Sequence, residues 1–196
     1  MMFDNALKMD AHVTSICKSA NFHLRNIGSI RSCSTDSAAA QLVHSLITSR
    51  LDYCNSLLVG LPENQIQKLQ RVQNNAARMV KRIRKFEHIS PVLSELHWLP
   101  ISKRIDFKLL LLVFKCLNNK GPKYLADLLI PYSHARETRS TQAHLLKVPR
   151  TKLMTYGDVA FQVAGPRAWN NLPLKLRLPM SLECFKRNLK THLFMS

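Results

Sequence analysis

The sequence predicts a mainly α-helical fold, on three observations. Apolar residues recur at intervals of three and four along most of the chain, which is the period of a helix with one buried face. Proline and glycine separate most of these periodic segments. The composition, 46% apolar residues and five glycines among 196, is that of a packed domain and not of a disordered basic tail.

The first third of the chain predicts two helices. The first begins at Asp10, which we expect to cap it, and stops at Gly28. The second covers about 36–58, because Ser34-Thr35-Asp36 supplies a cap and a first-turn acid, and Gly60 ends it. Their apolar positions are Val13, Ile16, Cys17, Ala20, Leu24 and Ile27, and then Ala39, Leu42, Val43, Leu46, Ile47, Leu51, Cys54, Leu57 and Leu58.

The middle of the chain predicts four further helical elements. A helix runs from Pro62 to about Lys85, and Ser90-Pro91 opens a short helical turn. Pro100 opens a longer helix that ends at Asn118-Asn119-Lys120-Gly121, and 122–130 is a short element.

The C-terminal part has a different pattern. Residues 133–155 alternate weakly and contain Pro149, which is typical of a loop with at most a hairpin. A last helix is predicted over 181–194, with Ser181 as its cap. We therefore expect a helical bundle followed by a small irregular or α+β C-terminal extension.

The net charge of +17 is unevenly distributed, because residues 1–60 contribute only +1. The helix predicted over 62–85 gathers its cations on the face opposite its apolar residues. These cations are Arg71, Arg78, Lys81, Arg82 and Lys85. Since no acid lies between Asn64 and Phe86 to neutralise these cations, a polyanion is the predicted partner. Two alternatives are that the cations form an ordinary solvated face, or that the helix lies on an anionic membrane surface.

A second basic cluster lies between 147 and 190, where Arg167, Lys186 and Arg187 are further candidate contacts to nucleic acid. Tyr156, Phe161 and Trp169 lie among these cations. Aromatic rings beside cations suit stacking on unpaired bases, and they equally suit the core of a small C-terminal subdomain.

Nothing in the sequence predicts catalysis, a metal or a cofactor. No two acids are adjacent or separated by one residue, so paired metal ions would lack their carboxylates. The signatures of nucleotide hydrolysis, esterase, zinc-protease and dinucleotide sites are also missing. Five cysteines without a C-x-x-C predict free thiols rather than zinc ligands or disulfides.

A series of motifs lies along both halves of the chain. In the first half these are Phe3-Asp4-Asn5-Ala6-Leu7, His12-Val13, Leu24-Arg25-Asn26-Ile27, Ser49-Arg50-Leu51-Asp52-Tyr53-Cys54-Asn55, Leu69-Gln70-Arg71-Val72-Gln73-Asn74-Asn75-Ala76-Ala77-Arg78 and Leu96-His97-Trp98-Leu99-Pro100. In the second half they are Tyr156-Gly157-Asp158-Val159-Ala160-Phe161, Ala164-Gly165-Pro166-Arg167-Ala168-Trp169-Asn170-Asn171-Leu172-Pro173 and Phe185-Lys186-Arg187-Asn188-Leu189-Lys190. This collinear series resembles the region that follows the catalytic palm in reverse transcriptases of non-LTR retrotransposons, the jockey-like LINE class.

The resemblance implies a remnant of the palm at 1–9, a helical thumb-like domain at 10–132 and a basic extension at 133–196. The aspartates that make this family RNA-directed DNA polymerases lie upstream of the matching region, so the chain is expected not to be an enzyme. The implied partners are RNA or an RNA/DNA duplex and a separate palm-bearing polypeptide, with no small-molecule substrate. The alternative is a helical protein-interaction module, or a decayed reading frame with no selected function.

The expected location is intracellular, either nuclear or cytoplasmic. The start of the chain carries an early acid and no apolar core of a signal peptide. The longest apolar run, from Leu109 to Phe114, has six residues, so we expect no membrane span.

Overall fold

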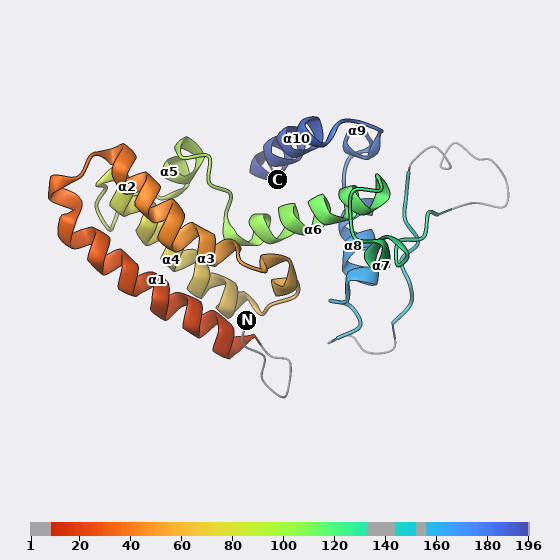
Figure 1. Ribbon diagram of the computed structural model, residues 1–196, viewed down its shortest axis with the longest axis horizontal. Helices are drawn as coiled ribbons and strands as arrows, with labels where there is room; N and C mark the ends of the chain where they lie inside the picture. The colour runs from red at the N-terminus through yellow and green to blue at the C-terminus, as the bar shows by residue number, and fades with distance from the viewer. Residues whose placement is uncertain (1–8, 133–143, 152–155, 196) are drawn as a thin grey trace. The chain divides into compact units, whose positions relative to one another are not determined.

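The computed structural model describes residues 9–132, 144–151 and 156–195, and in these residues the fold is mainly α-helical (Figure 1). The predicted fold class is therefore confirmed. Among the described residues, β structure is limited to one isolated antiparallel bridge between Pro131 and Leu146. None of the described helices is both long and apolar enough to cross a membrane.

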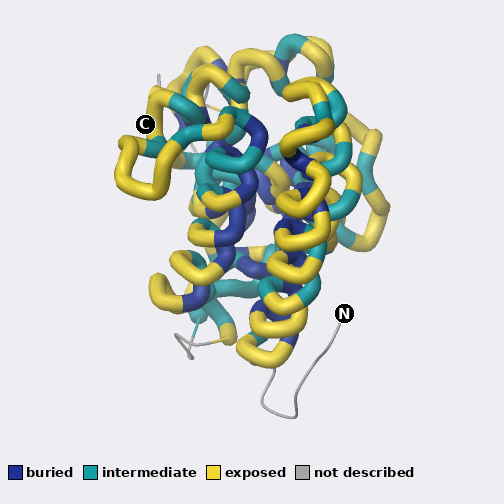
Figure 2. The backbone as a smooth tube through the Cα atoms, turned by 90° about the vertical axis from the view of Figure 1, so that its left-hand side faces the viewer, coloured by how far each residue is buried: buried dark blue, intermediate teal, exposed yellow. Residues whose placement is uncertain are grey.

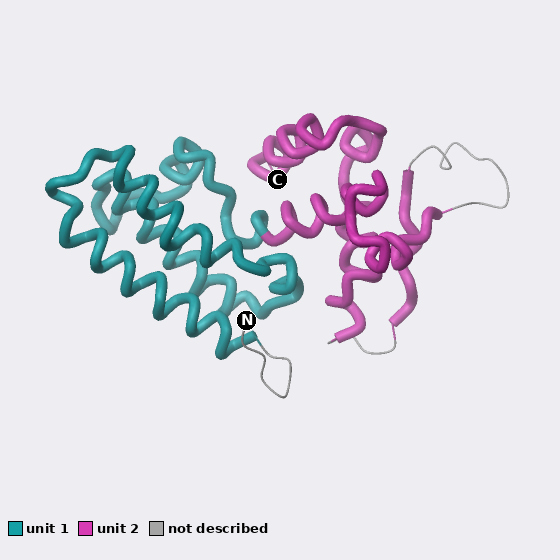
Figure 3. The backbone as a smooth tube through the Cα atoms, in the orientation of Figure 1, with its two compact units in different colours: residues 1–104 teal, residues 105–196 magenta. Residues whose placement is uncertain are grey.

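The chain forms two compact units, Met1–Arg104 and Ile105–Ser196 (Figure 3). Their boundary lies within helix α6 (Ile101–Leu117) and not at 132, where the sequence pattern changes. The domain limits implied by the resemblance stay a prediction, and most of the segment predicted as a palm remnant, 1–9, lies outside the described residues.

The first unit is built mainly from three long helical segments that lie side by side (Figure 1). Its helices are α1 (Asp10–Ile30), α2 (Asp36–Val43), α3 (Ser49–Asp52), α4 (Glu63–Lys81) and α5 (Ser90–Glu95). A π-helical segment, His44–Thr48, joins α2 to α3. Buried and exposed positions alternate along these helices as the three- and four-residue spacing predicts (Figure 2). Fully buried side chains in this core include Val13, Ala20, Val43, Ile47, Leu69 and Ala77.

Helices α1 and α4 run in the same direction. Near their N-terminal ends Lys68 is close enough to act electrostatically on Cys17, and near their C-terminal ends a Cβ on Gly28 would lie 3.6 Å from Met79 Cε. A Cβ at Gly28 would thus be in ordinary van der Waals contact with Met79, which places the C-terminal ends of the two helices beside each other. Surface residues of α1 and α4 therefore form two neighbouring rows that run in the same N-to-C direction.

Three predicted helix ends in the first unit differ from those observed. Asp10 is the first helical residue and not the cap, and α1 continues through Gly28 to Ile30. The helix predicted over 36–58 stops at Asp52, because Tyr53 has an extended backbone with ψ 115° and Cys54 then has a positive φ of 54°. The helix predicted to reach Lys85 ends at Lys81.

The second unit packs helices around a group of aromatic rings. It contains most of α6, with α7 (Lys123–Ala126), α8 (Phe161–Asn170), α9 (Leu174–Arg177) and α10 (Leu182–Met195). The Phe185 ring stacks on Phe114 with centroids 4.1 Å apart, and Trp169 lies 6.0 Å from Phe185. Trp169 is therefore a core residue, whereas Tyr156 is 51% exposed.

Helix α8 lies in a stretch for which no helix is predicted, and Gly165 and Pro166, which are ordinary signals for a break, lie inside it. The structure explains the glycine, since a Cβ there would lie 3.0 Å from Val113 Cγ2. Asn170 at the end of α8 bonds both backbone groups of Leu146, at 2.9 and 2.8 Å, and thereby holds the bridge segment.

Candidate nucleic-acid interface

The five cations predicted to share one helix face lie in different environments. Arg71 is exposed in the middle of α4, as predicted. Arg82 has φ 54° at the C-terminal cap of α4, and Lys85 lies beyond the helix. The continuous helix face required for a row from 71 to 85 is therefore absent, and the prediction that α4 extends to Lys85 is wrong.

The cations at the C-terminal end of α4 are bound by groups from elsewhere in the first unit. Lys81 Nζ lies 2.5 Å from Glu95 Oε1, and Arg78 Nη2 donates to the Glu87 carbonyl at 3.3 Å. Arg82 Nη2 donates to the Ser34 carbonyl at 3.0 Å. These three side chains therefore contribute to the folded structure and are not simply free to meet a phosphate.

Arg31 explains why the chain after α1 returns to the end of α4. Its guanidinium is largely buried and donates to the carbonyls of Met79 and Val80, at 2.9 and 2.8 Å. Its Nη2 also lies 2.5 Å from Asp36 Oδ1. The hydrogen bond from Arg31, together with neighbouring positive charges, lowers the pKa of the Asp36 carboxyl below its ordinary value.

A different group of cations has no carboxylate partner among the residues that the structure describes. On α1 and α4 it consists of Lys18, Arg25, Lys68 and Arg71, which we call the α1/α4 edge. All four are exposed and form no ion pair within the described part of the chain.

The α1/α4 edge is free of acids along most of its length. Each of the two helices carries a single acid, and both acids, Asp10 and Glu63, lie in the first turn. Burial raises the pKa of the Cys17 thiol, and the Lys68 charge opposes that effect, which places Lys68 beside α1. The four cations thus belong to one pair of packed helices.

The three candidate cations of the second unit are not equivalent either. Arg167 Nη2 lies 3.3 Å from Asp158 Oδ1, and Lys186 Nζ lies 2.6 Å from Glu183 Oε1. Arg187 is exposed on α10 and forms no ion pair with the described residues. Of the eight residues predicted to bind nucleic acid, Arg71, Lys85 and Arg187 are exposed without an ion pair of this kind.

Sequence reasoning named only Arg71 from the α1/α4 edge. A signal for Lys18 and Arg25 existed, since they are seven residues apart on the polar side of a predicted helix that has no acid after Asp10. Lys68 could have been found from the same acid-free stretch as Arg71. The pairing of α1 with α4, which brings the two rows together, is a tertiary feature without a local signature.

Neither metal-binding residues nor comparisons with known proteins indicate what the α1/α4 edge binds. Within the described residues, no three His, Cys, Asp or Glu side chains gather in a group that would hold a metal ion. Comparison with protein-family models, curated proteins and solved structures finds no match. The resemblance to reverse transcriptases gains no support from these comparisons and stays a prediction.

Proposed function

We propose that this chain is a noncatalytic nucleic-acid-binding protein that holds the phosphate backbone along the α1/α4 edge. The observation that carries the proposal is that Lys18, Arg25, Lys68 and Arg71 are exposed on two packed helices and form no ion pair with the described residues. No carboxylate of the described residues neutralises them, in a chain with a net charge of +17. A polyanion supplies the missing negative charge and releases its condensed counterions on binding.

The spacing of the edge suits a nucleic-acid strand. An α-helix rises about 1.5 Å per residue, so Lys18 and Arg25 are separated by roughly 10 Å along α1. Each strand of duplex DNA carries one phosphate about every 3.4 Å of helix axis, so two such cations can meet phosphates of the same strand. Lys68 and Arg71 lie one turn apart on α4, and packed helix axes are typically about 8–10 Å apart.

Lysine and arginine side chains placed in this way contact the backbone and not the edges of bases. We therefore expect binding that depends strongly on salt and weakly on sequence. The resemblance to the post-palm region of non-LTR reverse transcriptases implies the same ligands, RNA or an RNA/DNA duplex. A separate palm-bearing polypeptide would have to supply polymerase chemistry.

The proposal is tested by the variant K18Q/R25Q/K68Q/R71Q in the full chain. Glutamine is a good helix former, so the helical circular dichroism should be unchanged. The slope of log affinity against log salt should fall by about 0.9 for each duplex phosphate that the variant no longer neutralises, or by about 0.7 on a single strand. Fluorescence anisotropy with a labelled RNA/DNA duplex measures both affinity and slope.

The matched control is K108Q/K120Q/K123Q/K175Q, which removes four exposed lysines of the second unit and changes the net charge equally. We expect its salt slope to stay close to that of the unaltered chain. Equal losses in the two variants would show that binding follows overall charge, and an unchanged slope in the edge variant would exclude phosphate contacts there. Either result would reject the α1/α4 edge as the interface.

A further inference from the structure

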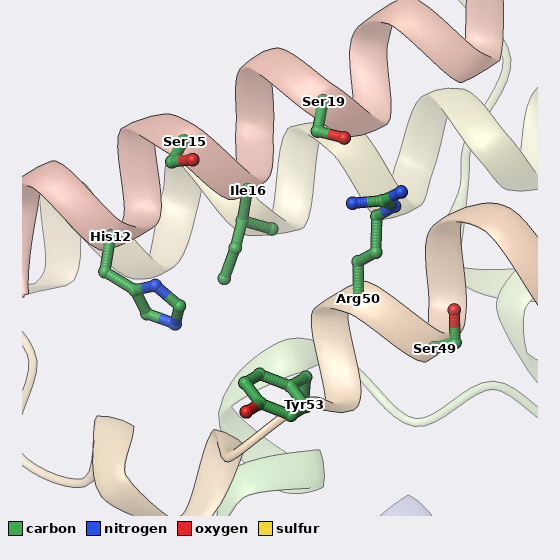
Figure 4. A pocket seen from close by; sticks show the side chains of 7 residues that line it. All are labelled: His12, Ser15, Ile16, Ser19, Ser49, Arg50 and Tyr53. Carbon is green, nitrogen blue, oxygen red and sulfur yellow. The ribbon is translucent and has the colours of Figure 1, made fainter. Parts of the chain in front are cut away.

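A polar cavity lies between α1 and α3, on a different side of α1 from the α1/α4 edge (Figure 4). Its volume is about 490 Å³. Figure 4 shows four side chains reaching from α1 and three from α3 and the residue that follows it. The lining residues are His12, Ser15, Ile16, Ser19, Ser49, Arg50 and Tyr53.

Arg50 gives the cavity a positive charge that the lining does not neutralise. No carboxylate lines the cavity, and Arg50 is exposed with no ion pair among the described residues. Asp52, two residues away, is held by Arg104 through both carboxylate oxygens. The guanidinium of Arg50 is thus available, and its planar fork matches the oxygens of a phosphate group.

Neutral polar groups surround this cation. Ser15 and Ser19 lie about one turn apart on α1, and neither hydroxyl forms a hydrogen bond with the described residues. Ser49 donates its hydroxyl hydrogen to the Ser45 carbonyl, so it remains an acceptor only. The two serines of α1 can therefore donate to a bound oxyanion.

His12 contributes a buried imidazole whose Nε2 atom has no hydrogen-bond partner among the described residues. The residue is only 6% exposed. Burial lowers the pKa of His12 below its ordinary value, so the imidazole is neutral at neutral pH and can donate or accept one hydrogen bond at each nitrogen. A buried polar group left in this way is stabilised when a ligand or water pairs with it.

The cavity also offers an aromatic surface. Tyr53 is 56% exposed, and its hydroxyl forms no hydrogen bond within the described residues. Ile16 reaches from α1 toward Tyr53 (Figure 4). A volume of about 490 Å³ is far more than a bare phosphate needs and lies in the range of small-molecule sites.

We propose that this cavity binds a phosphate monoester that carries an aromatic ring, the chemistry of a nucleoside monophosphate. Arg50 and the serines of α1 would hold the phosphate, and Tyr53 would stack on the ring. The ligand is either a free nucleotide or the 5′-phosphorylated end of a nucleic-acid strand. This inference uses none of the four cations of the α1/α4 edge, so each proposal can fail without the other.

The test is calorimetric titration of the full chain with adenosine monophosphate, adenosine and inorganic phosphate. We expect the monophosphate to bind more tightly than either of its parts. R50Q should weaken its binding about tenfold, as removal of a charge-assisted hydrogen bond does. Y53L should weaken it several-fold, whereas Y53F keeps the ring and should bind nearly as well as the unaltered chain.

R84Q is the matched control, because Arg84 is an exposed arginine of the first unit that neither lines the cavity nor belongs to the α1/α4 edge. Its affinity for the monophosphate should be unchanged, and equal losses in R84Q and R50Q would overturn the site. Proton NMR gives a second readout, since the imidazole signals that H12Q removes should shift on titration. Absence of both heat and shift at millimolar ligand would also overturn it.

The two sources of the ligand are separated with short 5′-phosphorylated and 5′-hydroxyl oligonucleotides. The oligonucleotides are titrated into the K18Q/R25Q/K68Q/R71Q variant, so that binding of their phosphate backbone to the α1/α4 edge does not mask binding to the cavity. Preference for the phosphorylated strand over the monophosphate, abolished in R50Q, identifies a strand end. Preference for the free monophosphate identifies a nucleotide, and both results support the site.

Discussion

Helix α4 carries cations at both ends of its basic stretch, and their surroundings differ. Near the C-terminus, Lys81 and Arg82 meet a carboxylate and backbone carbonyls from segments before and after α4. In the N-terminal half, Lys68 and Arg71 face solvent and have no ion pair with the described residues. A cluster of charge in sequence therefore contains side chains that stabilise the fold and side chains free for a ligand.

The difference has a physical origin in the end of the helix. The last carbonyls of a helix have no partner within it, and the helix dipole favours cations there. In this chain Arg31 satisfies two of those carbonyls, and Asp36 then lies close to both Arg31 and Arg82. The middle of a helix presents no such groups, so cations there are left to solvent or to a partner.

The largest effect is expected from replacing Arg31 with methionine. The change leaves the carbonyls of Met79 and Val80 without their donor and removes the nearer of the two arginines beside Asp36. We expect a loss of about 2–3 kcal/mol in the free energy of unfolding. Arg71→Met should change it by about 0.5 kcal/mol or less, as at other exposed positions. Urea denaturation followed by circular dichroism measures both, and similar losses would contradict the contrast between the two arginines.

A smaller effect is expected when a bound cation is released. Glu95→Gln removes the carboxylate that holds Lys81 and makes that ammonium available to a phosphate. Affinity for a duplex should rise, and the salt slope should steepen by up to about 0.9. Glu63→Gln makes the same charge change on α4 but frees no ion-paired cation, since within the described residues Glu63 is bonded only by Gln67. A similar gain in both variants would indicate a response to net charge alone.

Much of the fold could be predicted because its helices follow local rules. Thr35 caps α2, accepting from the Ala38 amide at 3.2 Å, and Ser181 accepts from the Cys184 amide at 3.3 Å. Phe185, Leu189 and Leu193 form the buried stripe that their spacing indicates. These features depend on residues a few positions apart, which the sequence displays directly.

The rest could not be predicted, because it depends on contacts between distant segments. Gly165 and Pro166 are ordinary signals for a break, yet both lie inside α8, where the absence of a side chain at Gly165 lets the helix approach Val113. Arg82 has a helix-compatible side chain, and its positive φ accompanies bonds to Arg31 and Ser34 carbonyls that lie about fifty residues away. The cavity beside Arg50 likewise requires α1 and α3 to pack together.

The smallest effect concerns the acid stability of the Arg31 end of α4. Because the hydrogen bond from Arg31 lowers the pKa of Asp36, the unfolded chain takes up this proton at a higher pH than the folded chain does. The stability contributed by Asp36 is thus complete above about pH 4, the ordinary range of an aspartate, and disappears as the pH falls through the lowered folded value. Asp36→Asn should therefore lower the thermal midpoint at neutral pH, by an amount that is constant above about pH 4 and shrinks below it.

Thermal unfolding across pH 2 to 7 tests this, and the difference should largely vanish when Asp36→Asn is made in the Arg31→Met background. A difference that persists there would show that Asp36 acts through Arg82 or Lys81. Those two cations, and not Arg31, would then be the partners through which Asp36 stabilises the C-terminal end of α4.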